Sequence, residues 1–214
     1  ILAGDIWTVR HMGSPQPMRD RFEKFCRKEL SKYGRVLCVT GNHEPYGFNI
    51  DRMNDEIKAF LVGNAPNARL LVNEVEIIDG VAFLGTPLWA TCGVENGRDW
   101  QIRNSMNDFR LIRTREPLPE REIETMVGNE RLFTPSDANR LHQEALLWLE
   151  YELPLHDRIV VIGHHAPSFM SANGSRYGTE DLDAAYCSNQ NKLIEENPQI
   201  AIWIHGHTHK EERY

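Results

Sequence analysis

Four short apolar runs along the chain each end in a cluster of polar residues. The runs are Ile1–Ala3, Val36–Val39, Ile159–Ile162 and Ile200–Ile204. Their length and composition predict short buried strands, as in a parallel sheet that is covered on both faces. Parallel strands end at the same edge of a sheet, and open sheets place their chemistry at that edge. We therefore expect the four polar clusters to meet in space.

The segments between these runs have two other patterns. Residues 18–33, 50–62 and 136–153 carry apolar side chains at helical spacing, and Ser136 or Asp137 is expected to cap the last of these helices. Residues 70–72, 74–78 and 81–84 alternate as strands, with an Asp79-Gly80 hairpin turn before the last one. A parallel βαβ half thus passes into an antiparallel part, and the fold class is α/β.

Residues 91–140 break this regularity. The segment is polar, is rich in Arg and acidic residues and contains Glu116-Pro117-Leu118-Pro119-Glu120, so we expect an insertion with short helices rather than core strands. No internal repeat and no interdomain linker interrupts the chain. The 214 residues are 41% hydrophobic and fit one domain over residues 1–214.

Charge and cysteine content narrow the function classes. The net charge of -7 gives no basic footprint for nucleic-acid binding, so a phosphorylated substrate would have to be attracted locally. The four cysteines are scattered without C-x-x-C spacing and are expected to be reduced, buried thiols. No run approaches the roughly 20 apolar residues that cross a bilayer. A cytoplasmic location is the default expectation, and the sequence says nothing about the oligomeric state.

The polar clusters contain the ligand types of a metal site. They are Gly4-Asp5, Gly41-Asn42-His43-Glu44, Gly163-His164-His165 and His205-Gly206-His207-Thr208-His209. Carboxylate and amide oxygens together with imidazoles, and without thiolates, suit Mn, Fe, Zn or Co. A carboxylate can also bridge two ions, which makes a dinuclear centre plausible.

The residues alone leave several assignments open. Asp5 and Asn42 could instead be turn formers at strand ends, because both types hydrogen-bond their own backbone. His164 and His165 compete for one ligand position. Alternation along an extended segment sends His205, His207 and His209 to one side and does not choose between them.

The order of these clusters resembles the calcineurin-like metallophosphoesterase superfamily. Its signature runs D-x-H, G-D-x-x, G-N-H-D/E, G-H-x-P or similar, and G-H-x-H, each after a strand; the chain matches every element except the first. The resemblance implies a four-layered αββα sandwich of two mixed β-sheets flanked by helices, with metals at the strand ends. It implies metal ligation by Asp5, Asn42, His164, His207 and His209.

The D-x-H element has no counterpart before Asp5. The chain opens in the middle of the expected second strand and lacks an initiator Met, so a fragment is favoured over a natural variant. The family pattern uses two divalent ions, Mn, Fe, Zn or Co. The second metal would have Asp5, Asn42, His164 and His207, whereas the first would retain only Asp5 and His209. We therefore expect one ion to be held better than two.

The resemblance implies hydrolysis of a phosphate mono- or diester by attack of a metal-activated hydroxide. His43 would be the catalytic residue outside the coordination shell, contacting the phosphoryl group and protonating or stabilising the leaving oxygen. Glu44 is expected to fix the loop, and Trp7 and Tyr46 either stack on the substrate or simply pack. His205 is expected to pack or to support a ligand, and His11, His142 and His156 to be surface or helix residues.

The substrate class stays open at this stage. Protein Ser/Thr phosphatases carry Asp-Arg-Gly soon after the second element, and this chain does not, which favours the branch of small phosphoesterases. Monoesters, cyclic nucleotides, phosphodiesters and nucleic-acid ends all remain candidates. A non-catalytic scaffold with this fold, or a one-metal fragment, is the alternative interpretation. A metal-dependent amidohydrolase or deaminase is disfavoured, because neither an early H-x-H nor an H-x-E with C-x-x-C is present.

Overall fold

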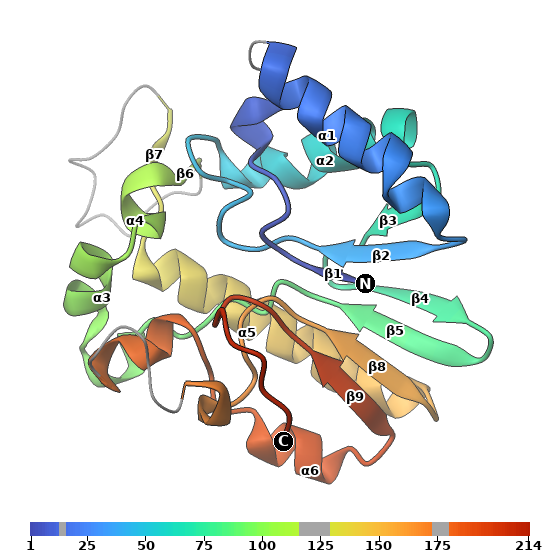
Figure 1. Ribbon diagram of the computed structural model, residues 1–214. Helices are drawn as coiled ribbons and strands as arrows, with labels where there is room; N and C mark the ends of the chain where they lie inside the picture. The colour runs from blue at the N-terminus through green and yellow to red at the C-terminus, as the bar shows by residue number, and fades with distance from the viewer. Residues whose placement is uncertain (13–15, 116–128, 173–179) are drawn as a thin grey trace.

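Two β-sheets lie face to face in the middle of the molecule, and helices cover their outer sides (Figure 1). The computed structural model describes residues 1–12, 16–115, 129–172 and 180–214. In Figure 1, α1 and α2 lie above the first sheet, α5 passes behind the second sheet, and α6 lies below it.

The first sheet contains three parallel strands in the order β1-β2-β3. Their bounds are β1 Leu2–Ala3, β2 Val36–Val39 and β3 Ala68–Leu70. Between β1 and β2 lie the 3-10 helix η1 (Val9–His11), α1 (Gln16–Lys28) and η2 (Leu30–Lys32), while α2 (Ile50–Asn64) connects β2 to β3. Both connections are crossovers of the length that parallel neighbours require.

The second sheet has the order β4-β5-β8-β9. Its strands are β4 Glu74–Ile78, β5 Val81–Gly85, β8 Ile159–Ile162 and β9 Ile200–Ile204. The first pair is an antiparallel hairpin, and the other two pairs are parallel. The hairpin turn expected at Asp79-Gly80 is confirmed: both residues have positive φ, 50° and 76°, which a two-residue turn of this kind requires.

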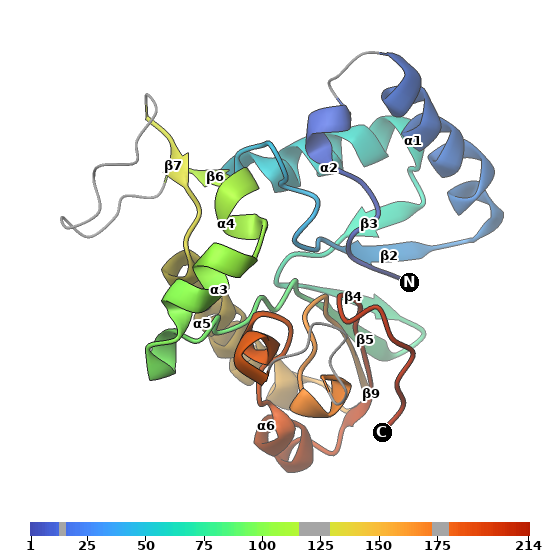
Figure 2. The ribbon, with the colours of Figure 1, turned by 60° about the vertical axis from the view of Figure 1, so that its left-hand side comes forward.

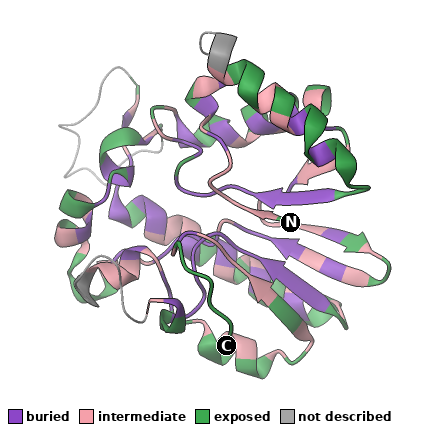
Figure 3. Ribbon diagram, in the orientation of Figure 1, coloured by how far each residue is buried: buried purple, intermediate pink, exposed green. Residues whose placement is uncertain are grey.

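The alternation of side chains along β2 and β8 explains why these runs are continuously apolar. In β2, Val36 and Cys38 face the core shared with α1 and α2, whereas Leu37 and Val39 face the other sheet. In β8, residues 159 and 161 face α5, and residues 160 and 162 face the first sheet. Both strands are therefore buried on both faces, as Figure 3 shows, and an apolar residue is needed at every position.

β9 differs from the buried strand that its sequence predicts. Ala201 is exposed and Ile202 is 54% exposed, because β9 lies at the end of the sheet order in the described residues. The expected strand at residues 70–72 also ends earlier, as β3 at Leu70. Leu71 is buried and its N–H bonds the carbonyl of Cys38, so it leaves the strand without leaving the core.

Between β5 and β8 the chain forms short elements and one long helix. These are η3 Val94–Asn96, α3 Asp99–Ser105, α4 Asp108–Leu111, the two-residue strands β6 Arg113–Thr114 and β7 Arg131–Leu132, and α5 Pro135–Glu152 followed by η5 Leu153–Leu155. Figure 2 shows α3 and α4 to one side of the sheets. Glu116-Pro117-Leu118-Pro119-Glu120 lies outside the described residues. The remaining elements are η6 Phe169–Ser171, η7 Glu180–Ala185 and α6 Asn191–Glu196.

The cap of α5 is Thr134 rather than Ser136 or Asp137. The Thr134 hydroxyl accepts a hydrogen bond from the N–H of Asp137, and the Asp137 carboxylate accepts one from the N–H of Thr134. This reciprocal capping box has Pro135 at the first helical position, where a missing N–H costs nothing. None of the described helices is both long and apolar enough to cross a membrane.

Candidate metal centre

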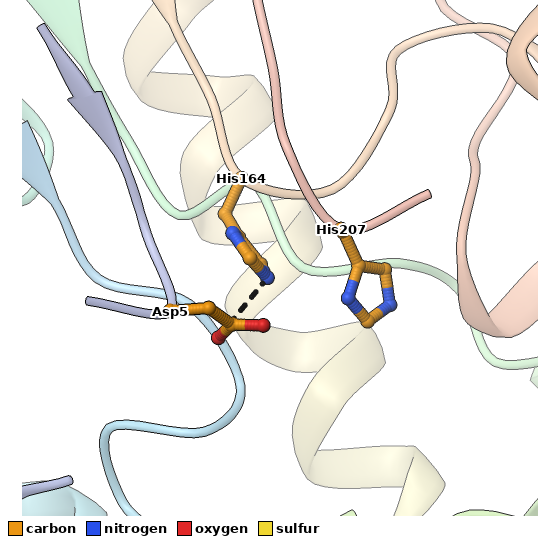
Figure 4. Close-up of side chains that lie close together, drawn as sticks. All are labelled: Asp5, His164 and His207. Atoms are coloured by element: carbon orange, nitrogen blue, oxygen red, sulfur yellow. Dashed lines mark ion pairs between the residues drawn. The ribbon is translucent and has the colours of Figure 1, made fainter. Parts of the chain in front are cut away.

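The loops that follow β1, β2, β8 and β9 meet at one edge of the two sheets. Asp5 and Asn42 come from the first sheet, and His164 and His207 come from the second. Ligand atoms of Asp5, His164 and His207 all lie within 4.8 Å of one another. Figure 4 shows these three side chains, on three separate loops, turned toward a common space. This convergence was predicted from the sequence, because each polar cluster follows the end of an apolar strand.

Asp5 supplies an ionised carboxylate. Its Oδ1 accepts a hydrogen bond from the N–H of His43 at 3.0 Å and lies 3.4 Å from His164 Nε2. Burial alone would raise the pKa of Asp5, but His164 and the His43 N–H outweigh it and lower the pKa to about 2. The buried Oδ2 has no hydrogen-bond partner within the described part of the chain. The backbone of Asp5 is left-handed, with φ 57°, a strained conformation of the kind that gathers at functional sites.

His164 is oriented by the first strand. Its Nδ1 lies 2.7 Å from the carbonyl oxygen of Ala3, which can only accept, so Nδ1 carries the proton and Nε2 keeps a lone pair in the neutral ring. Nε2 faces Asn42 Oδ1 at 3.1 Å and Asp5 Oδ1 at 3.4 Å. Three electron-rich atoms thus converge, and either a proton on Nε2 or a cation must neutralise them. Burial lowers the pKa of His164, but Asp5 and the Ala3 carbonyl raise it by more.

His207 adds a neutral imidazole to the same space. It is buried, and its Nε2 has no hydrogen-bond partner among the described residues. Burial and the neighbouring His165 and His164 hold the pKa of His207 well below its usual range, so the ring is unprotonated at neutral pH. A buried nitrogen lone pair without a partner is costly unless a ligand satisfies it.

Three glycines allow the ligand-bearing loops to approach so closely. A Cβ at Gly41 would lie 2.3 Å from Asp5 Oδ1, and one at Gly4 would lie 2.2 Å from His164 Nδ1. A Cβ at Gly206 would lie 2.7 Å from the Ala3 carbonyl oxygen. The Gly that precedes Asp5, Asn42 and His207 is therefore a packing requirement of the site.

Glu44 ties the first two loops together. Its buried carboxylate accepts hydrogen bonds from the N–H groups of Asp5, Ile6, Trp7 and Gly41. Burial and the nearby Asp5 raise its pKa, and the backbone donors oppose that shift. Glu44 thus fixes the geometry of the two loops, as predicted from the sequence. Its carboxylate is buried and is used by these backbone hydrogen bonds.

His43 and His209 lie outside the group of three. The side chain of His43 is 48% exposed, its Nδ1 lies 3.8 Å from Asp5 Oδ2, and its ring packs on Tyr46 at 4.6 Å. His209 is exposed and does not join the cluster that the described residues form. The structure therefore brings together four of the five expected ligands, Asn42 included.

Three other histidines, His165, His205 and His142, contact other parts of the protein. His165 is buried against Trp89, and His205 lies 3.0 Å from the hydroxyl of Ser171. His142 is a helix residue, as expected, because it lies on α5. It is buried there, with Nδ1 2.9 Å from the Leu88 carbonyl oxygen. Trp7 is buried and packs in the core.

Sequence reasoning missed Asp108, which lies at the start of α4. It is buried and accepts hydrogen bonds from Asn42 Nδ2 at 2.8 Å and from the Tyr46 hydroxyl at 2.6 Å. Burial raises its pKa, and these two donors oppose that shift. No apolar strand directly precedes Asp108 in the sequence, so no strand-end signal marked it.

The donor set fits a divalent cation. A carboxylate, an amide oxygen and two imidazoles with available lone pairs are the ligands that Mn, Fe, Zn and Co accept in proteins. A cation would satisfy the buried lone pair of His207, for which the described residues supply no partner, and would relieve the close approach of three acceptors at His164.

Comparisons with known proteins agree with this geometry. The chain matches the family model described as calcineurin-like phosphoesterase over residues 1–211. An uncharacterised protein of Acanthamoeba polyphaga mimivirus is 26% identical over 220 residues, which cover 96% of this chain and 72% of that protein. The crystal structure of phosphopantetheinyl hydrolase from Mycobacterium tuberculosis is similar with a TM-score of 0.55 at 13% identity, over 92% of this chain and 70% of that one. At this identity the similarity shows the fold.

Proposed function

Because the chain belongs to the calcineurin-like phosphoesterase family, and so is a hydrolase of phosphoric ester bonds, we propose that it cleaves a small phosphate mono- or diester where the loops after β1, β2, β8 and β9 meet. The observation that carries the proposal is the convergence of ligand atoms from Asp5, His164 and His207 within 4.8 Å. The amide oxygen of Asn42, 3.1 Å from His164 Nε2, completes the set.

These four side chains would hold one divalent ion. A bound ion of this kind supplies Lewis acidity and lowers the pKa of a water molecule toward neutrality. The carboxylate of Asp5 would be the anionic ligand, and Asn42 a neutral one, so that the site keeps enough positive charge to attract a phosphate dianion. This local attraction matters because the protein as a whole carries a net charge of -7.

The position of His43 supports a role for it on the substrate. Its half-exposed ring lies beside Asp5 without being enclosed by the group, and Tyr46 supports it from one side. We assign it contact with the phosphoryl oxygens and transfer of a proton to the leaving oxygen. An imidazole suits that role because it exchanges protons near neutral pH.

The number and identity of the ions belong to the same proposal. We infer one ion rather than two: of Asp5 and His209, the two residues expected at the first metal, Asp5 alone joins the group formed by the described residues, and His209 is exposed. Mn, Fe, Zn and Co are the candidate ions on the chemistry of the ligands.

The test measures hydrolysis of an aryl phosphate and of a bis-aryl phosphodiester by chelator-treated protein to which Mn, Zn or Co is returned. We expect ion-dependent hydrolysis of one ester over the other. His207→Ala should abolish the hydrolysis that added ions restore, because it removes a ligand. His43→Ala should lower kcat about 100-fold or more, as the loss of general acid catalysis does.

His156→Ala is the matched control, because His156 precedes β8 at the opposite end of that strand and bonds Glu152. It should retain wild-type kcat. Undiminished hydrolysis by His43→Ala would remove His43 from the chemistry. No hydrolysis of either ester with any of the three ions would contradict the proposed function and favour a binding role for this fold.

A further inference from the structure

We propose that Asp108 is a positioning residue that turns the Asn42 amide so that its carbonyl oxygen, and not its NH2 group, faces the metal position. The inference rests on the proposed function, because it assigns Asn42 as a ligand. Asp108 itself would touch neither the ion nor the substrate. Its effect would pass through the orientation of one side chain.

The amide of Asn42 has two ends of nearly the same shape but opposite chemistry. One end carries two N–H donors and the other a carbonyl oxygen, and only the oxygen can ligate a cation. The side chain is buried, so no water is on hand to equalise the two orientations. The groups that surround the amide must therefore select one.

Asp108 and Tyr46 select the orientation from one side. Asp108 Oδ1 receives two donors, Asn42 Nδ2 at 2.8 Å and the Tyr46 hydroxyl at 2.6 Å. Since both converge on Oδ1, this oxygen accepts whether or not the other oxygen carries a proton. The Tyr46 oxygen, having donated its hydrogen to Asp108, accepts from Asn42 Nδ2 at 3.2 Å. Both neighbours of Nδ2 are thus acceptors.

The opposite orientation would disable the site as well as break these bonds. It would place the amide oxygen against Asp108 Oδ1, which would be a contact between two acceptors. It would also point an N–H at His164 Nε2, which now lies 3.1 Å from Asn42 Oδ1. That N–H would donate to the lone pair that His164 offers to the cation. One rotation of the amide would therefore remove two ligands, the Asn42 oxygen and His164 Nε2.

The carboxylate is held firmly enough to do this. Asp108 is 3% exposed, and the carbonyl of Leu111, at the end of α4, accepts from the N–H of Gly47 in the Asn42 loop at 2.9 Å. Phe109 packs on Phe133, with their ring centroids 6.1 Å apart, within the core beneath α2. The short helix α4 is therefore anchored both to the core and to the loop that it orients.

The test measures the affinity of the chelator-treated protein for Mn or Zn by calorimetry, with no substrate present. Asp108→Asn keeps the shape of the side chain but offers the Asn42 amide both a donor and an acceptor. We expect a 10- to 100-fold loss of metal affinity, the usual cost of removing a group that orients a ligand. Tyr46→Phe, a milder change, should give a smaller loss in the same direction.

Testing Asp108→Asn in a second protein, the Asn42→Asp variant, separates an effect on amide orientation from a general loss of structure. In Asn42→Asp, both oxygens of the side chain can ligate, so orientation no longer matters and Asp108→Asn should cost little or nothing there. An equal loss in both backgrounds would show that Asp108 acts on structure alone, and would overturn the proposal. So would an Asp108→Asn affinity within twofold of wild type. The Co-loaded protein's visible absorption gives an independent signature of the ligand change.

Asp99→Asn is the control from the same segment, since Asp99 lies at the start of α3, and it should leave metal affinity unchanged.

The two proposals can fail separately. Wild-type protein that binds metal but cleaves neither ester contradicts the function and leaves the affinities to decide the role of Asp108. Active wild-type protein with an unaltered Asp108→Asn affinity contradicts the role of Asp108 alone. Wild-type protein that binds no metal contradicts both.

Discussion

At the scale of single residues, the approach of Asp5 to His164 depends on the absence of a side chain at Gly41. A Cβ there would lie 2.3 Å from Asp5 Oδ1 and 2.5 Å from His164 Cε1. Both groups are fixed by hydrogen bonds: the backbone N–H of Asp5 donates to Glu44, and the ring of His164 donates to the Ala3 carbonyl. Neither can yield without leaving its ligand position.

We therefore expect Gly41→Ala to lower the affinity for Mn or Zn at least tenfold, which corresponds to about 1.4 kcal/mol. Calorimetric titration of the chelator-treated variant measures this. Gly34→Ala is the matched control, because a Cβ at Gly34 meets no atom within 4 Å, and its affinity should equal that of wild type. Equal affinities for the two variants would mean that the ligands adjust and that the glycine is not needed for the site.

The residues that could be predicted from the sequence are those whose position follows from a strand end. Asp5, Asn42, His164 and His207 each come within four residues of the last residue of an apolar strand. Parallel pairing brings Asp5 beside Asn42 and His164 beside His207, and the packing of the two sheets on each other brings the two pairs together. Asp108 could not be predicted, because a tertiary contact from the irregular segment brings it to the site. The family resemblance implied His209 as a ligand beside His207, but the left-handed backbone at both residues breaks the extended alternation that would send their side chains to the same side.

At the scale of elements, the start of α5 combines a cap with a buried ion pair. Arg131 of β7 donates to Asp137 at 2.6 and 2.8 Å, and both side chains are buried. Burial alone would raise the pKa of Asp137, but the hydrogen bonds from Arg131 and Thr134 outweigh it and lower the pKa below its usual 3.8. The ionised carboxylate therefore stabilises the folded state.

The direction of the pH effect follows from that shift. A pKa that is lower in the folded than in the unfolded state gives a stabilisation that is complete above pH 3.8 and is lost as the pH falls below it. We expect Asp137→Asn to cost about 3 kcal/mol at pH 7, because it removes the negative charge that faces the buried guanidinium of Arg131. The cost should shrink as the pH falls below 3.8 toward the lowered pKa. Urea unfolding at pH 7 and near pH 3 measures both values.

The control at this scale is Glu144→Gln on the exposed side of the same helix. Glu144 pairs with Arg140, but both side chains are more than 40% exposed, and such pairs contribute well under about 1 kcal/mol. A penalty for Asp137→Asn that stays constant from pH 7 to pH 3 would contradict the charge-based account. It would leave the loss of helix capping as the explanation.

Elements with a strong local signal could be predicted, and those fixed by tertiary context could not. The spacing of apolar residues predicted α2 and α5, and the Asp79-Gly80 pair predicted the β4–β5 hairpin, where both residues have positive φ in the structure. The same reasoning gave β9 as buried because its five residues are all apolar, although its position at the sheet edge leaves two of them exposed. Periodicity reports which residues are apolar, and strand order decides which faces are covered.

At the scale of the whole molecule, the candidate metal centre lies where the two sheets meet. Two of its ligands are mounted on the first sheet and two on the second. The backbone adds one further link at the same place: the Ala3 carbonyl of β1 accepts from His164 beyond β8. An ion that is ligated from both sides would join the halves of the protein. The unfolded chain cannot offer the same arrangement, since the four ligands are spread over about 200 residues.

This arrangement predicts that the ion raises stability as well as activity. With free Mn or Zn at 100 times its dissociation constant, binding to the folded state alone contributes about 2.7 kcal/mol to the free energy of unfolding. Thermal unfolding followed by circular dichroism should therefore show a Tm that rises with added ion and falls when a chelator is added. His207→Ala, which removes a ligand of the second sheet, should respond much less, whereas His156→Ala should behave as wild type. A Tm that neither the ion nor the chelator changes would mean that the four side chains hold no cation, because ligation across two sheets necessarily favours the folded state.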